Sequence, residues 1–106
     1  MKQYQIVLVN LDPAMGSEIR KTRPCVIISP DEMNRHLRTL IVAPVTSRSK
    51  NYPTRIKVQV DDKSGWLVID QIRTIDKQRV VKSFGRLKDA EIESIRLVIK
   101  ETFVDP

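Results

Sequence analysis

Short β-branched and apolar runs, separated by turn residues, fill the first 87 positions and limit this chain to a mainly β fold. We predict strands at residues 4–11, 24–29, 39–46, 54–60, 66–71 and, more briefly, 82–87. The first two of these runs are too apolar for one face to be wet, which indicates strands that are central or covered. In the fourth, Ile56, Val58 and Val60 alternate with polar residues, so one face should contact water. Residues 61–65 are the predicted hairpin loop.

The hydrophobic period changes at Asp89, the predicted N-cap of a C-terminal helix over residues 89–103. Ile92, Ile95, Ile99 and Phe103 recur at helical spacing and would pack on the sheet. Short antiparallel strands followed by one packing helix predict a small β-barrel of the α+β class. With 106 residues, of which 41% are hydrophobic, the chain should form a single domain, residues 1–106.

Charge is distributed unevenly along the chain. Lys and Arg number 19 against 13 Asp and Glu, which gives a formal net charge of +6. Residues 1–88 contain 17 of these bases and 8 of the acids, so the excess of positive charge lies in the predicted barrel and not in the predicted C-terminal helix. Such a field favours a polyanionic partner without identifying it.

Several classes of chemistry are excluded within one chain. Cys25 is the only cysteine and His36 the only histidine, which rules out an internal disulfide, a multi-histidine metal site and paired-histidine catalysis. We predict a buried, inert thiol for Cys25 and a solvated surface position for His36. No metal or cofactor is expected. Because there is no signal-peptide-like segment and no apolar run near the about 20 residues of a membrane span, a cytoplasmic protein without membrane contact is expected.

Residues 12–24 form a polar loop with three conformationally special positions. Pro13 fixes one backbone angle and Gly16 permits a positive φ. Pro24 drives the preceding residue, Arg23, into an extended conformation. The pattern predicts that Arg23 is held at the mouth of the strand that follows.

Six polar residues lie at the ends of predicted strands: Arg23, Thr46, Ser47, Asp70, Gln71 and Arg73. A carboxylate such as Asp70, directly after an apolar run, needs a partner, and Arg23 is the candidate. The alternative is a salt bridge that merely fastens two strands. Residues 47–53 add basic, hydroxyl and aromatic groups, a combination that suits a nucleic-acid backbone.

Five segments, taken in order, closely resemble the MazF/PemK toxins of bacterial toxin–antitoxin systems. They are Val9-Asn10-Leu11-Asp12-Pro13, Gly16-Ser17-Glu18, Thr22-Arg23-Pro24, Val42-Ala43-Pro44-Val45-Thr46-Ser47 and Asp70-Gln71-Ile72-Arg73-Thr74-Ile75-Asp76. The resemblance implies an SH3-like antiparallel barrel with a C-terminal helix, a homodimer, and metal-independent, sequence-preferring cleavage of single-stranded RNA that inhibits translation and growth. It also implies a cognate antitoxin protein, with operator DNA contacted only through the toxin–antitoxin complex.

The resemblance also implies roles for individual positions. Arg23 matches the family's catalytic arginine, Thr46 the hydroxyl residue paired with it, and Asp70 a carboxylate that some members use in catalysis. The implied RNA-binding residues are Ser17, Glu18, Arg20, Lys21, Ser47, Arg48, Lys50, Tyr52, Gln71 and Arg73. Val68 and Ser17 stand where one branch of the family has an arginine and a histidine, so the mechanism of that branch cannot be transferred whole.

Three assignments stay open between alternatives. If the strand is regular from Trp66 to Asp70, both side chains share one face, where the Trp66 ring could stack on a base; otherwise Trp66 covers the barrel end or the dimer seam. Tyr52 could stack a base or anchor its loop. A set of basic residues either follows phosphates or forms a solvated surface: Arg20, Lys21, Arg48, Lys50, Arg73, Lys77 and Arg79.

Two classes of function fit these residues. The leading hypothesis is an endoribonuclease toxin. The other is a non-catalytic barrel of the same fold that binds nucleic acid or protein, as the gyrase-poisoning, CcdB-like relatives of this fold do. Arg23 and Thr46, in their expected contexts, favour the enzyme.

Overall fold

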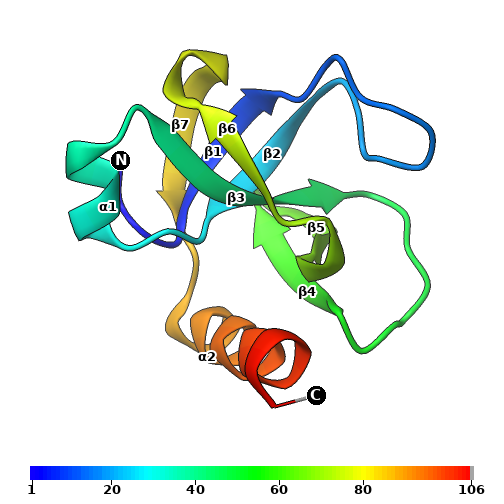
Figure 1. The fold of residues 1–106 in the computed structure, drawn as a ribbon. Coiled ribbons are helices and arrows are strands. Elements are labelled where there is room, and N and C mark those ends of the chain that lie inside the picture. The colour runs from blue at the N-terminus through cyan, green and yellow to red at the C-terminus, as the bar shows by residue number, and fades with distance from the viewer. Residues whose placement is uncertain (106) are drawn as a thin grey trace.

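A computed structural model describes residues 1–105 as a curled antiparallel sheet with a helix at its C-terminal end (Figure 1). The strands are β1 Gln5–Asn10, β2 Thr22–Ile27, β3 Thr39–Thr46, β4 Arg55–Val60, β5 Lys63–Val68, β6 Arg73–Asp76 and β7 Val80–Arg86. The helices are α1 Asp31–His36 and α2 Asp89–Ile99, with 3-10 turns η1 Ile69–Gln71 and η2 Lys77–Arg79 and a π-helical turn η3 Lys100–Val104. The predicted α+β, mainly β class is confirmed.

Strand β3 is the centre of the sheet. The strand order is β4-β5-β3-β2-β1-β7, and β6 pairs with β3 outside this path. The first half of β3 pairs with β6 through Thr39 to Val42, and its last two residues pair with Leu67 and Trp66 of β5. β3 therefore belongs both to the part of the sheet formed with β4 and β5 and to the part formed with β6, β2, β1 and β7. The sheet curls around β3, and the C-terminal end of β3 lies where these two parts meet.

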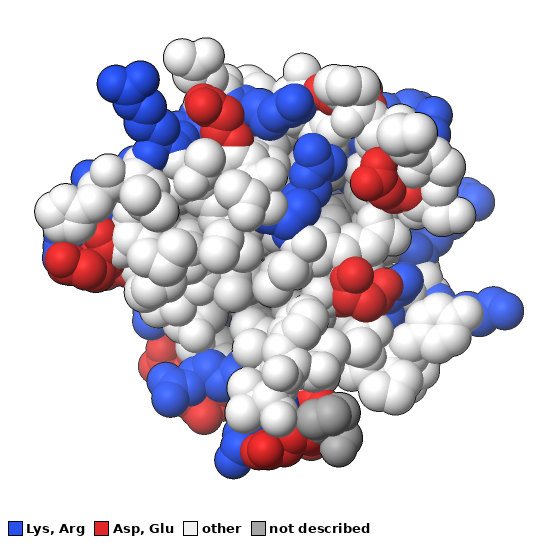
Figure 2. Space-filling model, viewed as in Figure 1, with Lys and Arg blue, Asp and Glu red and all other residues white. Residues whose placement is uncertain are grey.

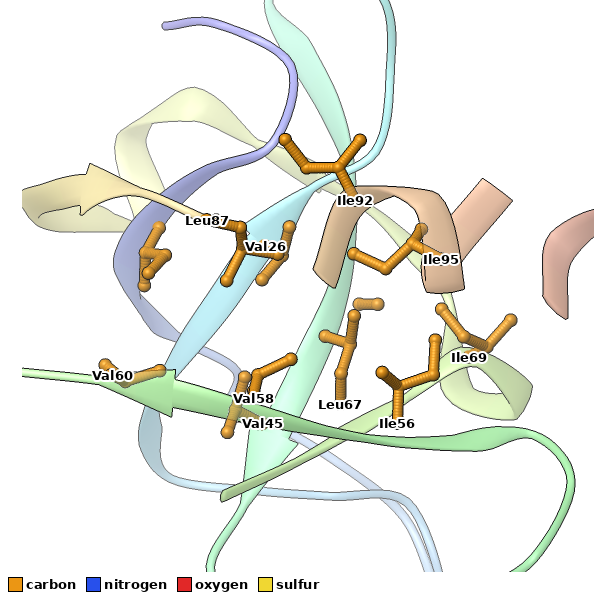
Figure 3. Packing of buried hydrophobic residues seen from close by; sticks show 12 residues of the cluster. Val26, Val45, Ile56, Val58, Val60, Leu67, Ile69, Leu87, Ile92 and Ile95 are labelled. Carbon is orange, nitrogen blue, oxygen red and sulfur yellow. The ribbon is translucent and has the colours of Figure 1, made fainter. Parts of the chain in front are cut away.

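The core consists of two clusters on opposite faces of this sheet. In the larger one, Ile92 and Ile95 of α2 lie over Ile56, Leu67 and Ile69 (Figure 3). The smaller contains Val7, Val9, Leu11, Cys25, Ile27, Leu40, Val42 and Ile75. Adjacent residues of β2 therefore enter different clusters, which confirms the prediction that the first two strands are covered on both faces.

The cysteine and the histidine of this chain both lie where the sequence predicts. Cys25 is fully buried, and burial raises the pKa of its thiol to about 12, so the predicted inert thiol is confirmed. His36 lies on α1 with an exposed side chain, and its Nε2 is 3.2 Å from Glu32 Oε1. The predicted surface position of His36 is therefore also confirmed.

The hairpin between β4 and β5 is tighter than predicted. Its turn is Asp61 and Asp62, whose φ angles of 50° and 66° suit a two-residue turn, and Val60 already pairs with Lys63. Gly65, predicted in the loop, lies inside β5, where an added Cβ would be 2.6 Å from Val45 Cγ1. Glycine is thus required at this position for close packing against β3, not for a turn.

The predicted strand through residue 71 is wrong because β5 ends at Val68. Leu67, Val68 and Ile69 are all fully buried, so burial alone does not mark where the strand ends. The chain instead makes the 3-10 turn η1, whose Ile69 N–H donates to Thr54 O at 3.1 Å. The inference that Trp66 and Asp70 share one strand face fails with it.

Three further boundaries differ from the prediction. No strand is predicted between residues 71 and 82, where the structure has β6, anchored by one buried side chain, Ile75. The N-cap of α2 is Lys88, not Asp89, and the Lys88 N–H donates to Glu91 Oε1 at 2.9 Å. Phe103 lies in η3 with 55% of its surface exposed, so it does not extend the packing stripe of Ile92 and Ile95. Among residues 1–105 no helix has the length and apolar character needed to cross a membrane.

Candidate active site

Arg23 and Thr46 come together at one end of the paired strands β2 and β3. Cys25 pairs with Pro44 in antiparallel register, so residues two positions further along, Arg23 and Thr46, share the same end. Both border a pocket of about 310 Å³. The other lining residues are Pro24, Val45, Ser47, Val60, Asp61, Lys63, Ser64, Gly65 and Phe84. The sequence prediction missed the contribution of β7 and of the β4–β5 turn to this pocket.

The Arg23 guanidinium is tethered by one atom. Its Nε donates to the backbone oxygen of Arg20 at 2.9 Å. Among residues 1–105 no acceptor is hydrogen-bonded to either terminal nitrogen, Nη1 or Nη2. A guanidinium held in this way keeps the two-pronged edge that binds phosphate oxygens.

Thr46 fixes the start of the β3–β4 loop. Its Oγ1 donates to the backbone oxygen of Arg48 at 3.3 Å and accepts from the Arg48 N–H at 3.5 Å. This local turn holds the hydroxyl at the strand end beside the pocket. β2 begins at Thr22, two residues earlier than predicted, so Arg23 is the second residue of the strand.

The predicted pairing of Asp70 with Arg23 is wrong, because Asp70 binds Arg55. The Arg55 Nε donates to Asp70 Oδ1 at 2.8 Å and Nη2 donates to Oδ2 at 3.1 Å. Thr54 Oγ1 adds a third hydrogen bond to Oδ1 at 2.7 Å. The turn η1 brings Asp70 to the first residue of β4, and this fork-to-carboxylate geometry is the strongest form of ion pair.

The Arg55 partner could have been found from the sequence. A two-residue turn at Asp61 and Asp62 sets a register in which Arg55 pairs with Val68, two residues before Asp70. The alternation with Ile56, Val58 and Val60 predicts that Arg55 is on the water-facing side of the strand. Its side chain is in fact only 17% exposed.

The Arg55 hydrogen bonds, followed by the one from Thr54, hold the pKa of the Asp70 carboxyl below its ordinary value. A lowered folded-state pKa stabilises the fold above the unfolded pKa of about 4, and this stabilisation is lost as pH falls through the folded value. Asp70→Asn should therefore lower the free energy of unfolding by about 1 kcal/mol at pH 7, a modest value because the carboxylate is partly exposed. Urea unfolding of wild type and Asp70→Asn at pH 7, 4 and 2.5 measures the difference in the free energy of unfolding, which should become smaller as pH falls. A difference that stays constant across these pH values would contradict the stabilising role of the carboxylate.

A second pocket, of about 500 Å³, is lined by half of the remaining predicted site residues. Its lining is Ser17, Glu18, Ile19, Pro44, Asp70, Gln71, Ile72 and Arg73. Gln71 Oε1 accepts from the Ile19 N–H at 2.7 Å, and its Nε2 donates to Ser17 O at 3.3 Å. Arg73 Nη1 donates to Leu11 O at 3.2 Å. The structure thus divides the predicted site between two pockets that share β3.

The other predicted RNA-binding residues lie on exposed parts of the β1–β2 loop and the β3–β4 loop, and they line neither pocket. These are Arg20 and Lys21 before β2, and Arg48, Lys50 and Tyr52 after β3. Figure 2 shows basic side chains, with acidic ones between them, along the side of the molecule where these loops lie. The Arg55 guanidinium carbon is 5.2 Å from the centre of the Tyr52 ring, which favours the loop-anchoring alternative for Tyr52.

Some basic residues of the predicted phosphate track have structural partners. Arg79 Nη1 donates to the backbone oxygens of Asn10 and Asp12, and Lys77 donates to that of Asn34.

Trp66 is half-buried opposite Thr46, with Lys57 Nζ 5.2 Å from its ring centre. Within residues 1–105 no group of three or more His, Cys, Asp and Glu side chains is arranged to hold a metal ion.

Sequence and structure comparisons define the class of protein. The family described as PemK-like, MazF-like toxin of type II toxin–antitoxin system matches residues 2–103. A protein named Endoribonuclease MazF from Staphylococcus saprophyticus is 32% identical over 105 residues, covering 93% of this chain and 88% of that protein. The chain therefore belongs to the PemK/MazF toxin family.

Solved structures support the same fold. MazF of Deinococcus radiodurans superposes with a TM-score of 0.84 at 24% identity, covering 95% of this chain and 94% of that one. An endoribonuclease in complex with its cognate antitoxin, from a mycobacterial species, also has a TM-score of 0.84, at 20% identity, covering 100% and 97%.

Proposed function

We propose that this chain is the toxin of a type II toxin–antitoxin system and acts as a metal-independent, sequence-preferring endoribonuclease on single-stranded RNA, inhibiting translation and growth. The observation that carries the proposal is the pocket bordered by Arg23 and Thr46, in a chain whose relative is named an endoribonuclease. A guanidinium and a hydroxyl at adjacent strand ends are suited to a phosphate group.

The chemistry needs only the RNA, these side chains and solvent water, which accepts the proton of the 2′-hydroxyl and supplies one to the departing 5′-oxygen. The 2′-oxygen forms a bond to phosphorus and releases its proton, while the bond from phosphorus to the 5′-oxygen breaks and the departing oxygen gains a proton. Negative charge increases on the nonbridging oxygens between these events. Arg23 is the cation that stabilises this charge through its terminal nitrogens. Thr46 donates a hydrogen bond to a nonbridging oxygen by turning its hydroxyl proton away from the Arg48 backbone oxygen.

Arg23 is better suited to stabilising charge than to removing a proton. A guanidinium presents a fork of N–H donors and no acceptor, which suits it to bind negative charge and not to take up a proton. We assign the electrostatic role to Arg23. The exposed basic residues of the two loops, Arg20, Lys21, Arg48 and Lys50, are proposed to contact the RNA backbone and to make binding salt-dependent.

The proposed partners follow from the same family membership. A mycobacterial relative and MazF of Deinococcus radiodurans have each been solved with an antitoxin. We propose a cognate antitoxin for this chain, with acidic residues that complement its net charge of +6. We further propose a homodimer in the cytoplasm, which contacts operator DNA only as part of the toxin–antitoxin complex.

Incubation of the purified chain with single-stranded RNA in excess chelator tests the proposal. We expect discrete RNA fragments, formed at the same rate with and without the chelator, because the charge-stabilising cation is a side chain. Intact RNA under both conditions would contradict the enzyme and favour a non-catalytic binding barrel. Fragments that form only when Mg²⁺ is added would contradict the metal-independent mechanism.

A further inference from the structure

The 3-10 turn η1 is hydrogen-bonded to both loops that carry the proposed RNA-binding residues. Asp70 accepts from Thr54 and Arg55, at the end of the β3–β4 loop. Gln71, the next residue, bonds the backbone of Ile19 and Ser17 in the β1–β2 loop. Two consecutive side chains therefore connect segments that are more than 25 residues apart in the sequence.

Arg55 extends the Asp70 connection into the β3–β4 loop. While its Nε and Nη2 hold the carboxylate, its Nη1 donates to Ser49 Oγ at 2.7 Å. Its guanidinium also lies over the Tyr52 ring. One half-buried side chain thus contacts two residues of the loop and the turn at once.

The turn itself is firmly seated. Ile69 is fully buried in the larger core cluster, and the Ile72 N–H closes the turn onto Ile69 O at 3.2 Å. A turn anchored in this way can hold in place the two loops that are hydrogen-bonded to it. The bonds of Asp70 are charge-assisted, and those of Gln71 are made to the loop backbone.

The Asp70 carboxylate is already engaged on both oxygens. Oδ1 accepts two hydrogen bonds and Oδ2 one, all from neighbouring side chains. These bonds also lower the affinity of the carboxylate for a proton. The geometry is poorly suited to taking a proton from a 2′-hydroxyl, one way in which a catalytic carboxylate at this position could act.

We propose that η1 is a junction that sets the relative positions of the two RNA-binding loops, with Asp70, Arg55 and Gln71 as positioning residues. This inference rests on the proposed function. The affinity for RNA lying between the loops would then depend on the junction. The stabilisation of charge on the reacting phosphate would depend on Arg23 and Thr46. Loss of the junction should weaken substrate binding more than it slows the chemical step.

The test compares wild type with Asp70→Asn, Arg55→Met and the double variant. A further variant, Arg55→Lys, keeps the positive charge but not the pair of N–H donors that bind Asp70. Glu32→Gln and Arg35→Met remove a matched exposed ion pair on α1 as the control. Two measurements are made: amide hydrogen exchange of residues 47–54 and 17–21, and kcat and KM on a short RNA. Circular dichroism verifies that each variant is folded.

Asp70→Asn and Arg55→Met should each speed exchange in residues 47–54 and raise KM about tenfold, with kcat within about threefold of wild type. The double variant should be no worse than either single one, because both remove the same connection. Gln71→Ala should instead speed exchange in residues 17–21. The α1 control variants should change neither measurement.

Two results would overturn the proposal. One is unchanged exchange in both loops for every junction variant. The other is a fall in kcat of about 10²-fold or more for Asp70→Asn with kcat retained in Arg55→Met, which would make Asp70 a catalytic residue. If wild type cuts no RNA, the proposed function fails, but the exchange measurement still decides whether η1 holds the two loops.

Discussion

Arg23→Ala should slow RNA cleavage about 10²–10³-fold while leaving the protein folded. In the proposed mechanism the side chain stabilises charge that develops only as the 2′-oxygen attacks, so its loss should appear mainly in kcat. It borders a pocket, and its one hydrogen bond to residues 1–105 is with the backbone oxygen of Arg20. Removing it should therefore cost the fold little.

Rates on a short RNA at saturating concentration give the measurement. Arg23→Lys keeps the charge but replaces the fork of donors with a point charge, and should fall between wild type and alanine. Arg35→Ala, on the exposed face of α1, is the matched control and should cut at the wild-type rate. Wild-type cleavage by Arg23→Ala would show that the charge is stabilised by another group.

Ile95→Ala should lower the free energy of unfolding by about 2–5 kcal/mol, the usual range for emptying a core site of this size. Ile95 is fully buried and belongs to the cluster between α2 and the sheet (Figure 3). Because few other buried residues come from α2, the helix has little means of closing the cavity.

Urea unfolding followed by circular dichroism measures this loss. Leu97→Ala is the control on the same helix, since Leu97 is 58% exposed and should change stability by no more than about 0.5 kcal/mol. Equal losses for the two variants would contradict the packing arrangement of α2.

The strands and the C-terminal helix could be predicted because their side-chain periods follow from burial. Alternation in β4 and the helical spacing of Ile92 and Ile95 each report which face is covered. The same logic fails where neighbouring residues are all buried. Val68 and Ile69 look like one apolar run, and only the tertiary structure shows that the second of them begins a turn.

The pocket residues Arg23 and Thr46 were predictable, since each is a polar residue next to an apolar strand and the family resemblance names both. The partner of Asp70 was not predicted, because it depends on hairpin register. A turn of two aspartates at positive φ is an uncommon choice, and reading it as a longer loop concealed the pairing of Arg55 with Val68. The separation of Asp70 from Arg23 follows from that register and from η1.

The central claim is that this chain cuts RNA through its own 2′-hydroxyl at the pocket of Arg23 and Thr46, without a metal ion. The most direct test is to incubate the protein, in excess chelator, with RNA and DNA strands of identical sequence and to analyse the product ends. The account predicts that RNA is cut to fragments ending in a 2′,3′-cyclic phosphate and a 5′-hydroxyl, while DNA stays intact. Intact RNA, or equal cleavage of both strands, would contradict it.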